Sequence, residues 1–171
     1  MCKEKSFTTE NDYFYRKFKK MQRTFEIIRT SRKLASQFLE HYTLEQLNKI
    51  PEGFKNNLFW NIAHIVVTQQ LLVYKFSNLP MIISEELALK YMKGTKPELD
   101  ATQADFDEIK SLLSETIHHT KEDFDNGLFK SYQEYTTSTG LVLKNVEDAM
   151  VFNNFHEALH IGIMMSLRKL V

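Results

Sequence analysis

The sequence contains few of the residues that interrupt helices or cross-link chains. Its 171 residues include five glycines, three prolines and a single cysteine, Cys2. So few glycines and prolines argue against a turn-rich β-sandwich and against a disordered chain. A single cysteine cannot form an internal disulfide, so we expect a reducing compartment and a cytoplasmic protein. Cys2 also lies too close to the start of the chain to be a good candidate for a structural or catalytic thiol.

The chain also lacks an excess of either charge and any long apolar run. Twenty-two Lys and Arg balance 22 Asp and Glu, whereas proteins dedicated to nucleic acids usually carry a basic excess. The wholly apolar stretches fall far short of the roughly 20 residues that span a bilayer. Residues 1–20 contain no apolar segment typical of a signal peptide. We therefore expect neither a nucleic-acid partner nor a membrane partner.

Apolar residues at spacings of three and four predict four long helices. The expected helices cover residues 18–42, 56–77, 102–124 and 146–170, and a short helix covers residues 84–92. Ser84, Thr102 and Asn145 are the expected N-caps. Residues 1–17 form a loosely ordered extension, and residues 126–144 form a loop with a short extended piece near Tyr132–Tyr135. The predicted fold is all-α, a single domain over residues 18–171, with a long connection between the second and third helices of a four-helix bundle.

The second long helix carries a polar stripe although most of its surface is apolar. Asn57, Asn61, His64 and Thr68 follow one another at spacings of four, three and four, which places them on one helix face. The flanking positions are large and apolar. We therefore expect this stripe to line an internal pocket rather than to face water.

The last helix repeats this pattern with Asn153, His156 and His160. Two histidines four residues apart lie about 6 Å apart at Cβ, so both imidazoles can bind one metal ion. His64 is the expected third ligand. Three imidazoles and a water would leave an open coordination position, which is typical of a catalytic metal site. Asn61 and Asn153 are candidates to orient these ligands, and the ion is a divalent transition metal, with zinc or nickel preferred.

The residues from His156 to His160 also satisfy the pattern His-Glu-x-x-His. In zinc metalloproteases the glutamate of this pattern is the general base, a role that would fall to Glu157. Two features argue against a protease. The chain offers no convincing set of strands to align an extended peptide, and little sequence follows the motif to supply a third ligand.

Two segments around these histidines resemble the DinB-like (DinB/YfiT) superfamily of metal-binding four-helix bundles. They are Trp60-Asn61-Ile62-Ala63-His64 and the stretch from Asn154 to Gly162. The resemblance covers residues 18–171 and implies that His64, His156 and His160 bind a divalent metal. Family members of known activity are thiol-dependent transferases or isomerases that use a low-molecular-weight thiol such as bacillithiol or mycothiol, and members frequently form homodimers.

Three hypotheses follow from these residues. The first is a metal-dependent hydrolase or transferase, most specifically a thiol S-transferase that acts on a small molecule with a low-molecular-weight thiol as cosubstrate. The second is a non-catalytic metal-binding bundle or interaction module. The third is a metal-free bundle whose histidines are core residues. A homodimer is expected, but the sequence does not locate its interface.

Other charged residues have simpler interpretations. The segment from Arg16 to Lys33 contains eight basic residues and one acid, Glu26, and we interpret it as a solvated helix face. His41, His118 and His119 lie among polar residues near helix ends, so we expect them to face solvent as well.

Overall fold

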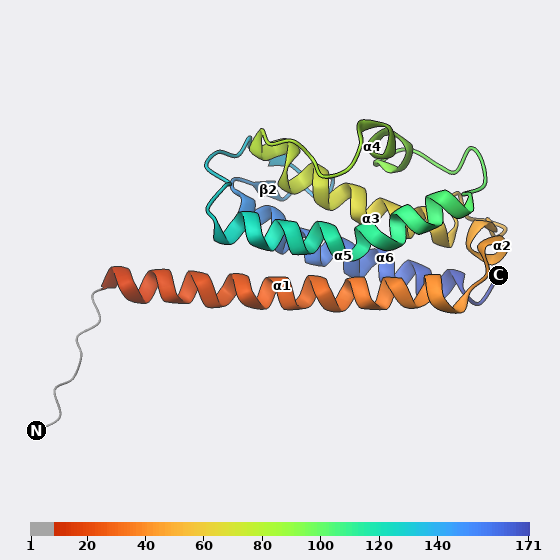
Figure 1. The fold of residues 1–171 in the computed structure, drawn as a ribbon, viewed down its shortest axis with the longest axis horizontal. Helices are drawn as coiled ribbons and strands as arrows, with labels where there is room; N and C mark the ends of the chain where they lie inside the picture. Colours follow the sequence, from red (N-terminus) through yellow and green to blue (C-terminus); the bar gives the residue numbers. More distant parts are fainter. Residues whose placement is uncertain (1–8) are drawn as a thin grey trace, which may run out of the picture.

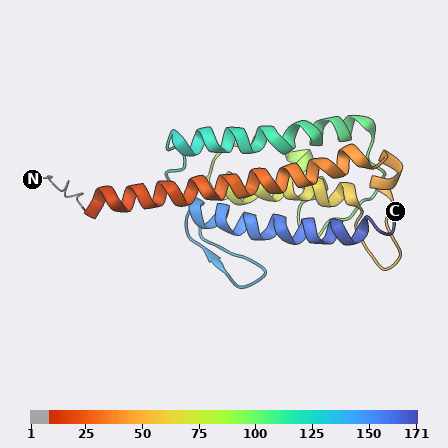
Figure 2. The same ribbon diagram turned by 90° about the horizontal axis from the view of Figure 1, so that it is seen from below.

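Four long helices run side by side in the computed structural model of the protein, which describes residues 9–171 (Figures 1 and 2). They are α1 (Thr9–His41), α3 (Leu58–Val73), α5 (Gln103–Asp125) and α6 (Val146–Leu167). α1 packs against α5 and α6, and α3 packs against the same two helices. The predicted all-α four-helix bundle is therefore confirmed.

Short elements occupy the connections between the long helices. They are α2 (Leu44–Asn48), the 3-10 helix η1 (Lys75–Ser77), α4 (Glu85–Tyr91) and the strands β1 (Tyr135–Thr136) and β2 (Val142–Leu143). The two strands form an antiparallel hairpin that pairs Tyr135 with Leu143 and Thr136 with Val142. α4 belongs to the long connection between α3 and α5 and packs against α3 (Figure 1).

Side-chain caps set the first turns of these helices. Ser84, Thr102 and Asn145 each accept a hydrogen bond from a backbone N–H in the first turn, as the sequence predicts. Asn57, expected on the polar stripe, is the N-cap of α3 and accepts from the N–H of Trp60. These caps satisfy backbone donors that have no partner within the helix.

α1 begins at Thr9 rather than near residue 18. Residues 9–17 of the expected extension are therefore helical, while residues 1–8, including Cys2, lie outside the described residues. Phe14 lies four residues before Phe18 and continues the helical spacing of the apolar residues, but the polar residues around it obscure this period. Once a helix is nucleated, each further residue adds a hydrogen bond at little cost. These first turns extend past the ends of the neighbouring helices (Figure 1).

α3 is the most buried helix of the bundle. Every residue from Leu58 to Val73 is buried except Thr68 and Leu71, which are half-buried. The sequence predicts this burial because apolar residues surround nearly the whole helix. Polar side chains on α3 are therefore held among apolar ones, where each needs a partner.

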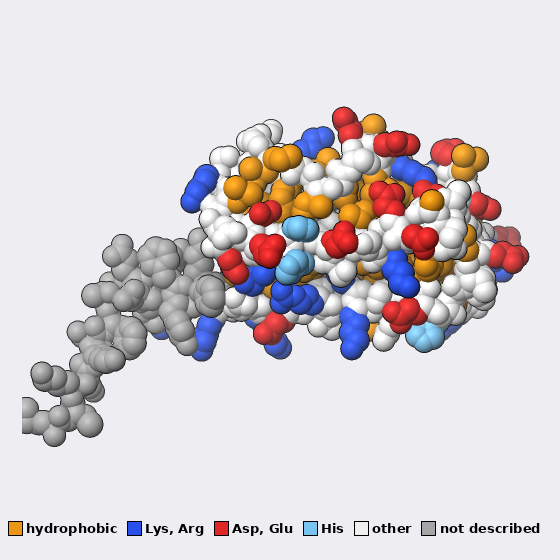
Figure 3. Space-filling view, viewed as in Figure 1, with side chains coloured by type: hydrophobic (Ala, Val, Ile, Leu, Met, Phe, Trp, Pro, Cys, Tyr) orange, Lys and Arg blue, Asp and Glu red, His pale blue; other side chains and the backbone are white. Residues whose placement is uncertain are grey.

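The surface agrees with the balanced composition of the chain. Charged side chains of both signs are spread over the face shown in Figure 3. The side chains of His118 and His119 are more than half exposed, as expected. Within residues 9–171, no helix combines the length and the hydropathy that a bilayer crossing requires.

A buried ion pair joins α1 to α6. The guanidinium of Arg32 donates from Nε to Oε1 of Glu157 at 2.9 Å and from an Nη atom to the backbone carbonyl of Ile65 on α3 at 3.1 Å. Asn153 donates to the same carboxylate oxygen at 2.8 Å. Arg32 is 4% exposed, so its interpretation as part of a solvated face is wrong.

The burial of Arg32 follows from its place in the helical period of α1. Residues that share its inward spacing are all buried, and they are Met21, Phe25, Ile28, Ala35 and Leu39. A charge at such a position is stable only when it is paired and hydrogen-bonded. Glu157, at the equivalent inward position of α6, supplies that pairing.

Replacing Arg32 with Met should strongly destabilise the fold, because the Glu157 carboxylate would stay buried without its cation. We expect the free energy of unfolding, measured by urea denaturation, to fall by about 3–5 kcal/mol. The double variant Arg32→Met/Glu157→Met should recover most of this loss, since it buries no charge. Arg29→Met on the exposed side of α1 is the control, and an equal effect of both single variants would contradict the role of the pair.

Candidate metal centre

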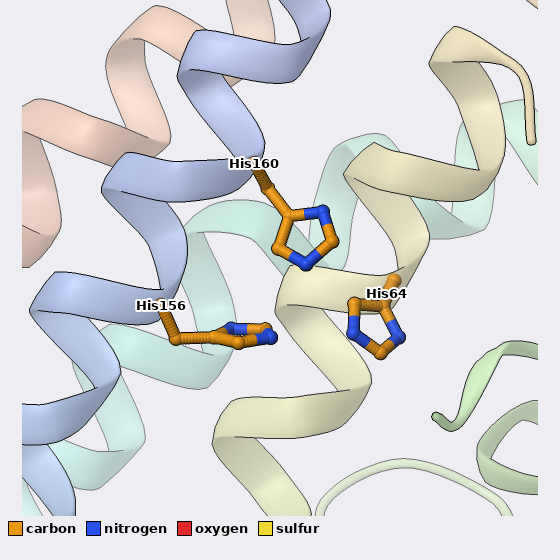
Figure 4. Close-up of side chains that lie close together, drawn as sticks. All are labelled: His64, His156 and His160. Atoms are coloured by element: carbon orange, nitrogen blue, oxygen red, sulfur yellow. The ribbon is translucent and has the colours of Figure 1, made fainter. Parts of the chain in front are cut away.

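Three histidines meet where α3 packs against α6. His64 comes from α3, and His156 and His160 come from successive turns of α6. Their ring centroids lie 5.1 Å apart for His64–His156, 4.7 Å for His64–His160 and 4.6 Å for His156–His160. One nitrogen of each ring lies within 4.8 Å of the other two, so the group could hold a metal ion. Figure 4 shows the three rings clustered between the two helices.

Hydrogen bonds define which nitrogen of two of these rings carries the proton. Nδ1 of His64 lies 2.6 Å from the backbone carbonyl of Tyr91, and Nδ1 of His160 lies 2.8 Å from Oδ1 of Asn61. Both oxygens can only accept, so both Nδ1 atoms donate. The amide nitrogen of Asn61 donates to the carbonyl of Asn57, which fixes the orientation of its side chain. In both neutral rings, Nε2 therefore keeps a lone pair that can bind a metal.

His156 has a different environment. Its Nδ1 is buried and has no hydrogen-bond partner among the described residues, and the same holds for Oδ1 of Asn153 and Oε2 of Glu157. Asn153 lies on the expected turn of α6, but its amide donates to Glu157 and not to a histidine. Asn61 contacts His160 in the way expected of an orienting residue. The orienting roles of both asparagines stay predictions.

Two further side chains on α3 contact His64. The indole of Trp60 stacks on the imidazole with ring centroids 4.4 Å apart and an angle of 13° between the planes. The hydroxyl of Thr68 lies 3.2 Å from Nε2. Because this nitrogen holds the lone pair, the hydroxyl donates to it, and a metal bound there would replace that hydrogen bond.

Sequence reasoning missed Trp60 and Tyr91 as parts of this site. Trp60 could have been found, because it lies one helical turn before His64 and shares its face. Tyr91 left no signal, because it contributes a backbone carbonyl from α4, which is distant in the sequence. Trp60 and Tyr91 also line a cavity of about 920 Å³ between α3, α4 and the start of α5. The indole N–H of Trp60 donates to Thr95 in the wall of this cavity.

Burial keeps the three imidazoles neutral. Desolvation is the main reason that the pKa of His156 falls to about 2 and that of His160 to about 4. The neighbouring histidines lower both pKa values further, and Arg32 adds to the effect on His156. Burial also lowers the pKa of His64, against the hydrogen bond to Tyr91, which raises it. Neutral imidazole is the form that binds a metal, so these rings need lose no proton at pH 7.

The arrangement argues against the metalloprotease hypothesis. A general base must reach a water at the metal, whereas Glu157 is fully buried and its carboxylate accepts hydrogen bonds from Arg32 and Asn153. The two-residue strands β1 and β2 form the one sheet in residues 9–171, and they are too short to align a peptide. The His-Glu-x-x-His spacing here reflects a buried ion pair beside two clustered histidines.

The metal-free protein should lose stability as the pH falls below about 6.5. In the unfolded chain the histidines take up protons near that pH, while in the folded chain their lowered pKa values keep them neutral. The unfolded state then binds more protons, so the free energy of unfolding falls by up to about 1.4 kcal/mol per pH unit for each histidine whose pKa is lowered. For His160 this continues down to about pH 4, and for His156 to about pH 2.

Urea denaturation between pH 7 and pH 5 measures this dependence. The variant His156→Gln/His160→Gln should show a clearly flatter profile, because two of the titrating groups are gone. His118→Gln/His119→Gln, which changes two exposed histidines, should keep the full slope. A double variant at positions 156 and 160 with an unchanged slope would show that these groups are not buried in the neutral form.

Comparison with known proteins agrees with this architecture. A family model described as the DinB superfamily matches residues 27–164, a range that includes all three histidines. A conserved protein from Enterococcus faecalis, known from a crystal structure, is similar with a TM-score of 0.61 and 13% identity, over 88% of this chain and 95% of that chain. At this identity the similarity shows the fold alone. No curated protein matches. The family model covers most of the chain, and the protein belongs to the DinB superfamily.

Proposed function

We propose that this protein binds one divalent transition metal through His64, His156 and His160. The observation that carries the proposal is that one nitrogen of each imidazole lies within 4.8 Å of the others, with His64 buried and His156 and His160 half-buried. Three imidazole nitrogens form a donor set that suits zinc and nickel. The hydrogen bonds of His64 to Tyr91 and of His160 to Asn61 support it further, because they orient two rings with Nε2 available.

We further propose that the site serves a reaction in which a low-molecular-weight thiol attacks a small electrophile. A bound divalent metal would lower the pKa of such a thiol and favour the reactive thiolate. The residues around the metal would orient the ligands and exclude water. Asn61 and the Tyr91 carbonyl orient the imidazoles, and Trp60 shields His64 from water. A small molecule in the cavity lined by Trp60 and Tyr91 would contact these two residues, which contact His64, and not the histidines themselves, none of which lines the cavity. A reducing cytoplasm suits a thiol cosubstrate.

A second candidate function is structural. His64 lies on α3 while His156 and His160 lie on α6, so a metal held by all three would cross-link the two helices. An ion that binds only the folded state stabilises it by mass action. This function requires no thiol and no electrophile, and its signature is a change in stability alone.

Metal content tests the site directly. Protein purified without a His tag should retain about one equivalent of zinc or nickel after dialysis, measured by elemental mass spectrometry. His156→Ala should lose it, because two imidazoles bind more weakly than three. His118→Ala removes an exposed histidine and should keep the metal. Absence of metal from the wild type, even after incubation with zinc and with nickel, would overturn the proposal.

Thiol consumption separates the two functions. The metal-loaded wild type should accelerate the loss of a low-molecular-weight thiol in the presence of an electrophile by at least about tenfold, because the thiolate is the nucleophile. His64→Ala should abolish the acceleration, and His118→Ala should keep it. If a broad panel of thiols and electrophiles gives no turnover while His64→Ala still lowers the melting temperature of the metal-loaded protein, the structural function replaces the catalytic one.

A further inference from the structure

A second cavity lies between α1 and α5, and its charged residues are all basic. Its volume is about 520 Å³, which is within the range of small-molecule sites. Four permanently charged side chains line it, and they are Arg29, Arg32, Lys33 and Lys110. Within residues 9–171, no Asp or Glu lines this cavity. None of the three clustered histidines lines it either, so it is separate from the candidate metal centre.

Helical spacing brings these cations together. Arg29, Arg32 and Lys33 lie three and four residues apart, which places them on one side of α1. Lys110 comes from α5, which packs along α1 (Figures 1 and 2). Figure 3 shows Lys, Arg and His side chains along the line where the two helices meet. A cleft lined by charges of one sign concentrates ligands of the opposite sign.

The protein itself does not neutralise the exposed cations of this cavity. Arg29, Lys33 and Lys110 form no ion pair within the part of the chain that the structure describes. Glu26 lies one turn before Arg29 on α1, but its carboxylate pairs with Arg23. The three cations can therefore pair with a ligand without first breaking an internal ion pair.

Arg32 adds a buried donor to this cavity. Its Nε and Nη2 atoms bind the carboxylate of Glu157 and the backbone carbonyl of Ile65. Its Nη1 atom is buried and has no hydrogen-bond partner among the described residues. Because two of the three nitrogens are bound to α6 and α3, Nη1 is the nitrogen left for a ligand in the cavity that Arg32 lines. A buried donor without a partner is costly, and an anion would supply the missing acceptor.

We propose that this cavity binds the phosphate group of a small phosphomonoester. Such a group carries up to about two negative charges and three strong acceptor oxygens, so it can contact cations from both helices. A carboxylate offers a single charge and two oxygens, which match fewer of these donors. Arg and Lys are also the side chains that proteins commonly use to bind phosphate.

Apolar side chains indicate the rest of the ligand. Leu113 and Ile117 on α5 are buried and line the same cavity as the cations. A bare phosphate ion would leave this apolar wall without a contact. Small-molecule sites typically combine apolar walls with a few placed polar groups. We therefore expect an apolar organic part on the phosphate, for which the phenyl ring of phenyl phosphate is a simple probe.

The cavity beside Trp60 has a different charge pattern and supplies a control. Its charged lining residues are three lysines and three acids, namely Lys55, Lys90, Lys96, Glu98, Asp100 and Asp105. A phosphate in that cavity would meet like charges as well as opposite ones, so the balance of charge does not favour it. Lys55 and Lys96 are both exposed, which makes them a matched pair for Lys33 and Lys110.

Isothermal titration calorimetry with phenyl phosphate tests the proposal. Lys33→Gln/Lys110→Gln should raise the Kd at least about tenfold, because it removes two charged donors to the phosphate. Lys55→Gln/Lys96→Gln should keep the Kd of the wild type. Inorganic phosphate should bind more weakly than phenyl phosphate, and phenol should not bind. Circular dichroism checks that both double variants fold.

This inference does not rest on the proposed metal, and one variant separates the two sites. Phosphate can also bind a metal ion, so binding at the histidines must be distinguished from binding between α1 and α5. His156→Ala, which is expected to lose the metal, should bind phenyl phosphate as tightly as the wild type. Loss of binding in His156→Ala, with binding kept in Lys33→Gln/Lys110→Gln, would overturn the proposal.

Histidine resonances locate the ligand. His118 lines the cavity, but its Nε2 lies 3.3 Å from a carboxylate oxygen of Glu122, so we use it as a reporter and not as a ligand contact. Its ring protons should shift in NMR spectra when phenyl phosphate is added, while those of His41, exposed at the far end of α1, should not. No binding by the wild type at millimolar phenyl phosphate, equal Kd values for the wild type and Lys33→Gln/Lys110→Gln, or an unshifted His118 would overturn the proposal.

Discussion

The packing of α3 against α6 is the contact on which the site depends. No histidine on either helix could form the cluster alone, because two imidazoles come from α6 and one from α3. The apolar residues around α3 bury it on nearly every side, and this burial sets the distance and rotation at which His64 meets His156 and His160. The same apolar surroundings lower the pKa values of the rings, so one feature of the sequence both assembles the cluster and keeps it neutral.

The buried ion pair of Arg32 and Glu157 is a second constraint on the packing around the cluster. Arg32 on α1 holds Glu157 on α6 and also donates to a backbone carbonyl of α3, so one buried guanidinium links three helices. Because Glu157 is adjacent to His156 in the sequence, the ion pair also restricts the rotation of α6 at the site. The positive charge disfavours protonation of His156. The interior of the bundle thus combines a buried charged pair with three uncharged rings. Glu157 contacts α1 through Arg32, whereas His156 and His160 face His64 on α3.

The fold and the ligand candidates were largely predictable from the sequence, for local reasons. Helix periods depend on neighbours three and four residues away, and caps such as Ser84, Thr102 and Asn145 act within one turn, so both leave a readable pattern. The histidine pair on α6 is visible for the same reason. The start of α1 was misplaced because Phe14, which continues the spacing of Phe18 and Met21, lies among polar residues that obscure the period. Arg32 was misinterpreted because its charge was given more weight than its inward position.

By itself the sequence determined that the chain forms apolar helices with histidines at matching spacings, since both properties depend on residues one turn apart. Only the tertiary structure decided which polar groups become partners. Asn61 contacts His160 across 99 residues, and Arg32 contacts Glu157 across 125. His64 contacts the backbone carbonyl of Tyr91, a partner that no side-chain type in the sequence indicates. These pairings depend on how helices that are distant in the chain are rotated against one another, and that rotation is set by the packing of all four at once.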